Sequence, residues 1–557
     1  MAVFFLHPGP VFPTTTPEPI FLSPLPCAVQ GQAQHAHKGF PVTPIPGHSD
    51  SPPAGGAPIH ASGYGWRHGS RINPTLDNVS FTVEPGEKVL LLGESGAGKS
   101  TLMAAIAGVL GSDEDGDATG TLTVGGIDPR HTKGVAGLVL QDPDSQVISS
   151  RVGDDVVFGC ENLGVDRETM WARARWALDV VGLELPLDHD TAKLSGGQKQ
   201  RLALAGVLAM GAKVILLDEP TANLDPEGVD EVRRAVIDAV NRTGATLVVV
   251  EHRVGIWADD VDTAIVLGTG ERGIIAHGPV RHVIDTQGAR LARQGVWIPG
   301  ITPQLPAARP VDTPVTDDNA VLGGQELVVG WNMDEPVSPP RNVSIPAGAS
   351  TVITGDNGAG KTTLALTLAG LLAPLDGRVV ASPALSHGTG SSSPHDWSSR
   401  QLAGRIGVVF QDPEHQFVAR TVREELELGP KIIGGADRRS LTDRILGRHS
   451  TGELDEKDRD RIDELLARLR LDHLAKANPF TLSGGQKRRL SVATALVTAP
   501  RVLVLDEPTF GQDRRTFTEL VVLLRELTDQ GVSLISVTHD HLYADALGDY
   551  RLEITAR

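Results

Sequence analysis

A stretch of fourteen residues occurs twice in this chain, as KLSGGQKQRLALAG at 193–206 and as TLSGGQKRRLSVAT at 481–494. The two copies are 288 residues apart, and the same spacing separates two later aspartates, Asp218 and Asp506. The block that runs from each copy to its aspartate is therefore duplicated without insertion. Further matches follow in the same order, which is typical of a duplicated domain. Because 557 residues of ordinary globular composition are too many for one core, the repeat predicts two large domains.

Upstream of each copy lies a glycine-rich sequence of the kind that binds phosphate, GESGAGKST at 93–101 and GDNGAGKTT at 355–363. Both fit G-x-x-x-x-G-K-[ST] between an apolar run and a helical pattern, which is the context that identifies a phosphate-binding loop. The glycines let successive backbone N–H groups point at phosphate oxygens, and the following helix adds its dipole. The residues expected to bind ATP are Gly93, Glu94, Ser95, Gly96, Ala97, Gly98, Lys99, Ser100 and Thr101 in the first loop, and Gly355, Asp356, Asn357, Gly358, Ala359, Gly360, Lys361, Thr362 and Thr363 in the second.

Downstream of each copy, an apolar run ends in two carboxylates and a proline, VILLDEP at 214–220 and VLVLDEP at 502–508. Such runs are typical of buried parallel strands, and α/β sheets bind ligands at the carboxyl ends of these strands. Adjacent strand residues point to opposite sides, so two neighbouring acids can have different tasks. The expected Mg²⁺ ligands are Ser100, Asp218, Thr362 and Asp506, while Glu219 and Glu507 are expected to polarise the attacking water.

Charge and cysteine content exclude several classes of function. The net charge of −18 argues against a protein that binds nucleic acid by neutralising its phosphates. Cys27 and Cys160 are the only cysteines, which indicates neither a disulfide framework nor a zinc site and favours a reducing compartment. No apolar run is long enough to cross a bilayer. Residues 1–57 are rich in proline without apolar periodicity, so we expect a disordered leader.

With these motifs the chain resembles two ATP-binding-cassette (ABC) ATPase domains fused in tandem, and LSGGQ is the signature of that family. The resemblance implies an α/β fold with two P-loop NTPase domains, each a mainly parallel sheet core with an antiparallel β subdomain and a helical signature subdomain. We place the first half at 58–290, a Pro-rich linker at 291–321 and the second half at 322–557. Lys99 and Lys361 are only 262 residues apart, so the second half has 26 extra residues before its signature, which we expect in loops at 386–399 and 450–461.

Other family positions can be matched one by one. Gln141 and Gln411, each in a Q-D-P sequence, resemble the Q-loop glutamine, which contacts Mg²⁺ and the attacking water. His252 and His539, at the ends of apolar strands, resemble the switch histidine that contacts the γ-phosphate. The D-loop aspartate is matched by Asp225 in ANLD and by Asp513 in FGQD, and the second sequence departs from the family pattern at Phe510 and Gln512.

An aromatic residue ahead of the phosphate loop stacks on adenine in this family. Trp66 and Trp331 occupy matching places, with Tyr64 as a rival in the first half and burial of the tryptophan as the alternative interpretation.

The signature forms a second phosphate cradle at the start of a helix. In ABC proteins two domains pack head to tail, so each ATP lies between the phosphate loop of one domain and the signature of the other. We therefore expect Lys99, Asp218, Glu219 and His252 to work with Ser483, Gly484, Gly485 and Gln486, and Lys361, Asp506, Glu507 and His539 to work with Ser195, Gly196, Gly197 and Gln198. Both halves retain every expected catalytic group, which predicts two hydrolytic sites that use ATP and Mg²⁺.

The fold alone leaves open what this ATPase moves. A tandem ATPase acting on ribosomes or DNA is one class, but the joint at 295–317 is Pro-rich rather than charged and helical. The segments 138–165 and 411–429 resemble the Q-loop region of energy-coupling factor (ECF) ATPases, importers of vitamins and transition-metal ions, whereas a sugar-importer ATPase lacks the double Q-D-P-x-x-Q. This resemblance implies an integral-membrane T component and a substrate-binding S component as partners, no nucleic acid, and a place on the cytoplasmic face of the membrane. It also implies a pseudo-dimer within one chain, and thiamine or its pyrimidine precursor as a candidate cargo.

Overall fold

The computed structural model describes residues 55–69, 73–110, 116–222, 224–269, 273–316, 318–332, 335–434 and 454–555. Residues 1–54 of the predicted leader and residues 450–453 of the predicted second insertion lie outside these ranges.

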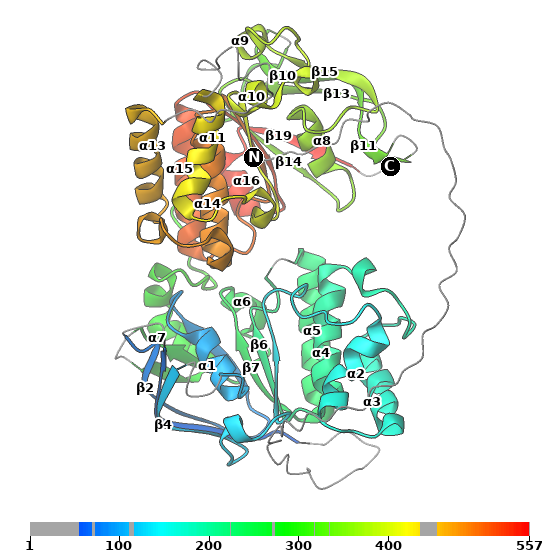
Figure 1. The fold of residues 1–557 in the computed structure, drawn as a ribbon, viewed down its shortest axis with the longest axis vertical. Helices are drawn as coiled ribbons and strands as arrows, with labels where there is room; N and C mark the ends of the chain where they lie inside the picture. The colour runs from blue at the N-terminus through cyan, green and yellow to red at the C-terminus, as the bar shows by residue number, and fades with distance from the viewer. Residues whose placement is uncertain are drawn as a thin grey trace, which may run out of the picture. The chain divides into compact units, whose positions relative to one another are not determined.

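A sheet of parallel strands forms the centre of each half (Figure 1). In the first half the order is β5-β6-β7-β3-β8-β9, and all neighbours are parallel except β8 and β9. In the second half the order is β16-β17-β18-β14-β19, and every pair is parallel. The strands are β3 (Lys88–Gly93), β5 (Ala136–Val139), β6 (Val214–Asp218), β7 (Thr246–Val250), β8 (Thr263–Leu267), β9 (Ile274–Pro279), β14 (Ser350–Gly355), β16 (Ile406–Val409), β17 (Val502–Asp506), β18 (Ser533–Val537) and β19 (Tyr550–Ile554).

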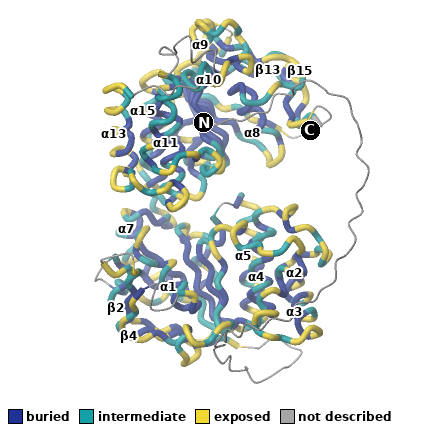
Figure 2. Tube along the Cα trace, in the orientation of Figure 1, coloured by how far each residue is buried: buried dark blue, intermediate teal, exposed yellow. Residues whose placement is uncertain are grey.

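Each central sheet separates two hydrophobic cores, because successive side chains of a strand point to opposite faces. Leu90 and Leu92 of β3 lie in one core, while Val89 and Leu91 lie in the other. All five residues of β6, β7, β17 and β18 are buried, and Figure 2 shows buried backbone at the centre of each half. The apolar runs thus form strands that are covered on both faces.

A smaller antiparallel sheet completes each half, with the order β2-β1-β4 in the first and β13-β10-β15 in the second. The second half adds the two-stranded pair β11-β12. These strands are β1 (Ile59–His68), β2 (Leu76–Val83), β4 (Gly116–Val124), β10 (Ala320–Val328), β11 (Gly330–Asn332), β12 (Glu335–Pro336), β13 (Arg341–Pro346) and β15 (Asp376–Ala381). The predicted α/β fold class, with parallel cores and antiparallel subdomains, is confirmed.

Helices pack beside the sheets, and α2, α3 and α4 contact one another as a helical layer in the first half (Figure 1). In the second half α11, α13 and α14 form the matching layer. The helices are α1 (Lys99–Ile106), α2 (Val152–Asn162), α3 (Arg167–Val180), α4 (Gly196–Ala209), α5 (Pro226–Thr243), α6 (Val254–Trp257), α7 (Val280–Arg293), α8 (Lys361–Leu368), α9 (Pro383–Ser386), α10 (Ser399–Ala403), α11 (Val422–Gly434), α13 (Glu456–Arg468), α14 (Gly484–Leu496), α15 (Arg514–Asp529) and α16 (His541–Leu547).

The two predicted insertions differ in structure. Residues 386–399 run from the end of α9 to the start of α10 and include a short 3-10 helix, Pro394–Asp396. The prediction of a loop at 450–461 was wrong for its second part, because α13 begins at Glu456. Asp455 caps this helix by accepting a hydrogen bond from the backbone N–H of Asp458 at 2.7 Å, and Ile462, Leu465 and Leu466 are buried on one face.

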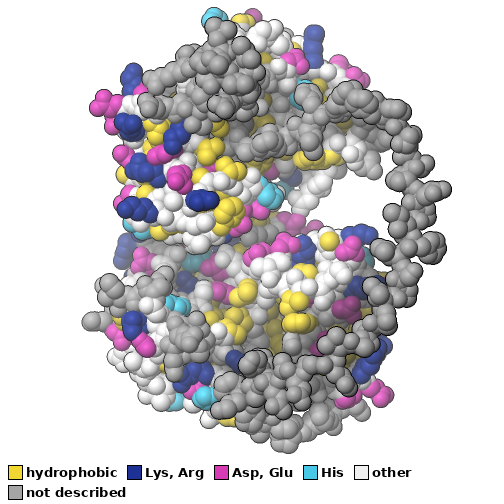
Figure 3. All heavy atoms as spheres, in the orientation of Figure 1, with side chains coloured by type: hydrophobic (Ala, Val, Ile, Leu, Met, Phe, Trp, Pro, Cys, Tyr) yellow, Lys and Arg dark blue, Asp and Glu magenta, His cyan; other side chains and the backbone are white. Residues whose placement is uncertain are grey.

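Among the described residues no helix is long and apolar enough to span a membrane. On the face drawn in Figure 3, acidic and basic side chains are interspersed with apolar ones.

Candidate nucleotide sites

The two phosphate loops have the same local structure. Lys99 begins α1, and its Nζ donates hydrogen bonds to the carbonyl oxygens of Gly93 (3.0 Å) and Glu94 (3.2 Å) of its own loop. Lys361 begins α8 and makes the equivalent bonds to Gly355 (2.9 Å) and Asp356 (2.7 Å). Burial lowers the pKa of both lysines. A cation and a set of helix N–H groups therefore meet at each loop, as phosphate binding requires.

A glycine directly precedes each of these helices in a left-handed conformation, with φ of 93° at Gly98 and 86° at Gly360. A Cβ atom at Gly98 would lie 2.8 Å from the side chain of Leu76, and one at Gly360 would lie 2.7 Å from Val337. Both the turn and the close packing explain why this position of the motif is glycine.

Hydroxyl and carboxylate oxygens meet beside each phosphate loop. Thr362 Oγ1 donates to the Asp506 carboxylate at 3.0 and 3.1 Å, and at the matching place the Ser100 side chain acts to lower the pKa of Asp218. Burial raises the pKa of both aspartates. Hard oxygen donors of this kind suit Mg²⁺, which would offset the buried negative charge and bind ATP phosphates. These four residues would hold the ion.

The two expected bases, Glu219 and Glu507, share a backbone conformation that is rare outside glycine. Their φ angles are 51° and 46°, and each backbone N–H donates to a neighbouring strand, to Val250 and to Val537 respectively, at 2.9 Å. Left-handed non-glycine residues carry strain and cluster at functional sites. The repetition of this feature in both halves indicates that it serves the site.

In the first half, Glu219 is held on two sides. Its Oε1 lies 2.8 Å from His252 Nε2, and its Oε2 accepts a hydrogen bond from Gln141 Nε2 at 3.0 Å. Burial acts to raise the pKa of Glu219, but the hydrogen bond and charge of His252, together with the charge of Lys99, outweigh it and leave the pKa below its ordinary value. The structure thus brings the predicted Gln, Glu and His together.

In the second half, Glu507 has a different environment. His539 Nε2 is 3.8 Å from Glu507 Oε1, and Thr538 Oγ1 donates to Oε2 at 3.1 Å. Burial raises the pKa of Glu507 to about 7 despite the Thr538 hydrogen bond. Burial also lowers the pKa of His539, and the charge of Lys361 adds to that effect. The two halves therefore hold equivalent residues in unequal electrostatic states.

The position before each switch histidine accounts for part of this difference. Glu251, which is 5% exposed, accepts hydrogen bonds from Thr221 Oγ1 and from the backbone N–H groups of His252 (2.8 Å) and Arg253 (3.2 Å). The second half has Thr538 here, which donates a hydrogen bond to Glu507 instead. The sequence interpretation did not single out Glu251, although the contrast between VEHR and VTHD could have indicated it.

The Q-loops are tied to the signature helices through their backbone carbonyls. Gln200 of α4 donates to the carbonyl of Leu140 at 3.2 Å, and Arg488 at the matching place in α14 donates to those of Phe410 (2.8 Å) and Gln411 (2.6 Å). Burial lowers the pKa of Arg488 to about 10. A shift of either signature helix would therefore move the Q-loop of the same half.

The LSGGQ pattern has a local structural reason. Ser195 caps α4 by accepting from the backbone N–H of Gln198 at 3.3 Å, while the Gln198 side chain accepts from the Ser195 N–H at 2.9 Å. Gln486 accepts from the Ser483 N–H at 2.9 Å in the same way. This reciprocal cap fixes the first turn of the helix. The remaining N–H groups of that turn, at Gly196 and Gly197, stay available to an anion.

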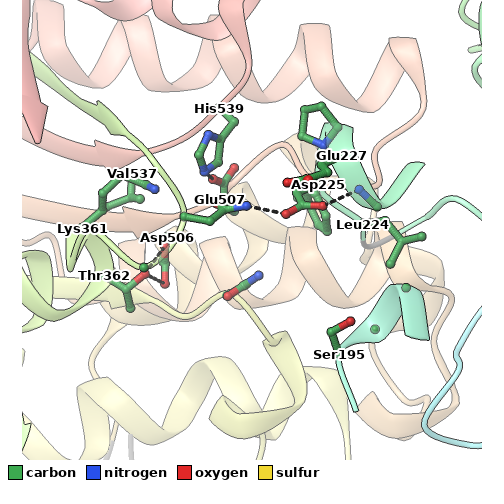
Figure 4. A pocket seen from close by; sticks show the side chains of 18 of the residues that line it. Ser195, Leu224, Asp225, Glu227, Lys361, Thr362, Asp506, Glu507, Val537 and His539 are labelled. Atoms are coloured by element: carbon green, nitrogen blue, oxygen red, sulfur yellow. Dashed lines mark hydrogen bonds and ion pairs between the residues drawn. The ribbon is translucent and has the colours of Figure 1, made fainter. Parts of the chain in front are cut away.

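One cavity of about 830 Å³ is lined by both the signature of the first half and the phosphate loop of the second half (Figure 4). Its lining includes Ser195, Gly196, Gly197, Gln198 and Asp225 from the first half, and Trp331, Asn357, Gly358, Gly360, Lys361, Thr362, Thr363, Gln411, Asp506, Glu507 and His539 from the second. The volume is in the range of small-molecule pockets. The matching cavity between Lys99 and the residues Ser483 to Gln486 stays a prediction.

The two D-loop aspartates both cap helices but have different outer partners. Asp225 caps α5 by accepting from the Gly228 N–H at 2.8 Å, and its other oxygen accepts from the side chain of Asn357 in the phosphate loop of the second half. Asp513 caps α15, and its carboxylate lies close to Gly295 of the segment after α7.

The expectation for Trp66 was wrong. This side chain is 2% exposed, its Nε1 donates to His68 at 3.3 Å, and a Cβ atom at Gly116 would lie 2.8 Å from its ring. Its ring face is therefore unavailable to adenine. The rival, Tyr64, is also buried. Trp331 is 65% exposed and lines the cavity, as stacking on a base requires.

The family model for the ABC transporter matches residues 76–222 and 340–510. The chain is 32% identical over 504 residues to the Bacillus subtilis protein named "Putative HMP/thiamine import ATP-binding protein YkoD", covering 85% of this chain and 86% of that protein. It is 31% identical over 523 residues to an Enterococcus faecalis protein named "Putative ABC transporter ATP-binding protein", covering 86% of each.

Among solved structures, the chain resembles one in the "Model of ribosome-bound archaeal Pelota and ABCE1", with a TM-score of 0.56, 21% identity, and coverage of 88% of this chain and 76% of the other. At this identity the likeness bears on the fold alone.

Proposed function

Because the chain belongs to the ABC transporter family, as an ATP-binding protein with two fused domains, we propose that it is the energy-coupling ATPase of an ECF-type importer. Its enzymatic activity is ATP hydrolysis, with ATP bound together with Mg²⁺. Proteins of this kind act on membrane-embedded partners. We propose the T component as the partner that this chain moves and the S component as the one that binds the cargo.

We propose two crossed ATP sites within one pseudo-dimer, formed by the halves at 58–290 and 322–557. At each site the glutamate polarises water for in-line attack on the γ-phosphate, and the switch histidine and Q-loop glutamine orient the reacting groups. The cavity that joins Ser195 and Lys361 supports the crossed pairing for the second site. Bound ATP holds the two halves together, and hydrolysis lets them separate. This opening would change the conformation of the membrane partner.

The exposed apolar side chains beside the two Q-loops carry the transport proposal. Ile148 and Val418 each follow the Q-loop glutamine by seven residues, and they are 63% and 50% exposed. Phe158 of α2 is 39% exposed in the same region of the first half, and Phe480 is 48% exposed in the second. Ile148 and Val418, presented to solvent at matching positions of the two halves, fit two helices of an integral-membrane partner.

The cargo and location follow from the same proposal. A relative named for HMP/thiamine import supports thiamine or its pyrimidine precursor as the transported compound. The chain would act at the cytoplasmic face of the membrane, where ATP is available, and would not bind nucleic acid.

Affinity purification of the full chain from native membranes tests this proposal. We expect integral-membrane partners to be recovered with the wild-type chain and lost with the double substitution Ile148→Asp and Val418→Asp, whereas ATPase activity of the purified chain persists. Val109→Asp is the matched control, because Val109 is 60% exposed but lies three residues after the end of α1, away from the Q-loop in the sequence. Recovery of ribosomes in place of membrane proteins, or of partners equally with both variants, would refute it.

A further inference from the structure

The segment after α7, residues 294–302, lies within the predicted linker but is packed between the halves. Val296 (1% exposed) and Ile298 (5% exposed) belong to a core of the first half, while Trp297 between them packs against a core of the second half. Alternating side chains of an extended segment point to opposite sides. The segment therefore packs against the hydrophobic cores of both halves.

Trp297 is bonded through its main chain to the switch loop of the first half. Its N–H donates to the carbonyl of His252 at 2.8 Å, and its carbonyl accepts from the Val254 N–H at 3.1 Å. Together with the parallel bridge between Arg253 and Trp297, these bonds hold the loop that carries His252.

The side chain of Trp297 contacts the D-loop of the second half. Its Nε1 donates to the carbonyl of Gln512 at 3.0 Å, and its ring lies edge-on to Phe517 with centroids 5.1 Å apart. Gln512 is one of the two positions at which this D-loop departs from the family pattern. Trp297 thus joins the switch loop of one half to the D-loop of the other.

Two neighbouring residues reinforce this connection. Arg514, at the start of α15, donates through its backbone N–H to Gly295 (2.7 Å) and through its guanidinium to the carbonyls of Ala292 (3.0 Å) and Thr302 (3.1 Å). Gly295 has a φ of 102°, and a Cβ atom there would lie 2.8 Å from the Asp513 carboxylate. Only glycine lets the segment pass this close to the D-loop aspartate.

The segment also reaches the phosphate loop of the first half. Gln294 Nε2 donates to the Glu94 carboxylate at 3.4 Å. The D-loop of the first half has a different arrangement, in which Asp225 bonds to Asn357 without an intervening segment. The connection through Trp297 therefore acts on the first site.

We propose that Trp297 is a positioning residue for ATP hydrolysis at the first site, because it couples the His252 loop to the Gln512–Asp513 backbone of the opposite half. This inference rests on the proposed function of two crossed hydrolytic sites. With the tie intact, closure of the second half brings the D-loop and His252 into place together. Without it, His252 and the D-loop adopt their positions independently, so fewer bound ATP molecules are in the reactive arrangement.

The test introduces Trp297→Phe into two full-length backgrounds that isolate the sites. Glu507→Gln leaves the first site active, and Glu219→Gln leaves the second. Phenylalanine keeps the aromatic contact with Phe517 but lacks the N–H donor. We expect kcat at the first site to fall about fivefold, the effect of losing one hydrogen bond, with the KM for ATP unchanged and no change at the second site.

Arg514→Lys is a second variant, which retains the charge but loses the two-carbonyl contact, and it should reproduce the first-site effect. Arg515→Ala is the matched control, because that side chain bonds to Glu519 on its own helix. Equal losses at both sites, a change confined to KM, or no change in either background would overturn the inference.

Hydrogen exchange separates this inference from the proposed function. Trp297→Phe should speed amide exchange in the peptides that contain Val254 and Gln512, whether or not the single-site variants hydrolyse ATP. Absence of hydrolysis in both backgrounds would refute independent sites, whereas unchanged exchange in these peptides would refute the tie itself.

Discussion

The two glutamates proposed to activate water, Glu219 and Glu507, should respond differently to acid, because their environments differ. Burial raises the pKa of Glu507 to about 7, and Thr538 donates to it at 3.1 Å while His539 stays 3.8 Å away. Glu219 has a pKa below its ordinary value of 4.5, because His252 at 2.8 Å and the charge of Lys99 outweigh burial. Each glutamate must be ionised to accept a proton from water.

The expected size of the effect follows from these values. A group with a pKa of about 7 is about nine-tenths ionised at pH 8 and about one-tenth ionised at pH 6, so activity that depends on Glu507 should fall roughly tenfold over that interval. Glu219 stays ionised throughout, so activity that depends on it should change by less than about twofold. Acidification should therefore lower the activity of the second site before that of the first.

Variants that retain only one glutamate allow the pH dependence of each site to be measured separately. Glu219→Gln reports on the second site and Glu507→Gln on the first, and kcat/KM for ATP is measured from pH 6 to pH 8 because it reflects ionisation of the free enzyme. If kcat/KM fell equally in both variants as the pH was lowered, the reasoning would be refuted. A steeper fall in the variant that retains Glu219 would also refute it. Complete loss of hydrolysis in either variant would contradict the independence on which the calculation rests.

Three further changes have defined expectations. Glu251→Ala should lower the single-turnover rate at the first site about tenfold, since two N–H groups of the switch loop lose their buried acceptor, while Glu251→Gln should retain most activity. Arg525→Ala should lower the free energy of unfolding by about 3–5 kcal/mol in urea titrations, because it leaves the Asp549 carboxylate (side chain 3% exposed) without its ion-pair partner, whereas Arg281→Ala at an exposed pair should cost less than about 1 kcal/mol. Trp331→Ala should raise the KM for ATP about fivefold through loss of stacking, and an unchanged KM would exclude that role.

The parts of the sites that sequence predicted best are those whose chemistry is local. The phosphate loops, the acidic strand ends and the signature caps depend on residues within a few positions of one another. Gly98 precedes Lys99 with a left-handed backbone, and Gln198 closes a reciprocal cap with Ser195 three residues earlier. Such patterns determine a conformation before any tertiary contact forms, which is why they can be read from sequence.

Trp66 shows what a local pattern leaves undetermined. Its pairing with β2 shifts register between Ala61 and Tyr64 and again between Tyr64 and Trp66. A shift of one residue exchanges the buried and exposed faces of a strand, and Trp331 lies in the separate pair β11-β12, so the matching place of the two tryptophans in the sequence did not give them the same exposure. The start of α13 at Glu456 was not predicted for another reason. Its capping aspartate and acidic first turn were interpreted as part of a charged loop.

Long-range contacts form the other group that sequence did not reveal. Trp297 and Gln512 are 215 residues apart, and no periodicity or motif connects them. Proline at 299 and in the residues that follow favoured a passive linker, whereas the buried residues Val296 and Ile298 anchor the segment. Composition describes the linker as a whole, but the packing depends on a few residues within it.

Fusion of the halves gives a physical reason for unequal sites in a protein with duplicated motifs. In a dimer of identical chains, any segment that packs at one site has a copy at the other, so both sites have the same environment. A single connecting segment leaves the first half at one place, and here that place adjoins His252 and the D-loop at Asp513. Once the segment packs there, the equivalent positions at the other site face a different environment, in which Asp225 bonds directly to Asn357. Gln512 meets the segment through its backbone carbonyl, whereas Phe510 lines the cavity of the second site. A chain in which the D-loop sequence ANLD replaces FGQD should therefore change activity at both sites, at the first through the contact with Trp297 and at the second through the loss of Phe510.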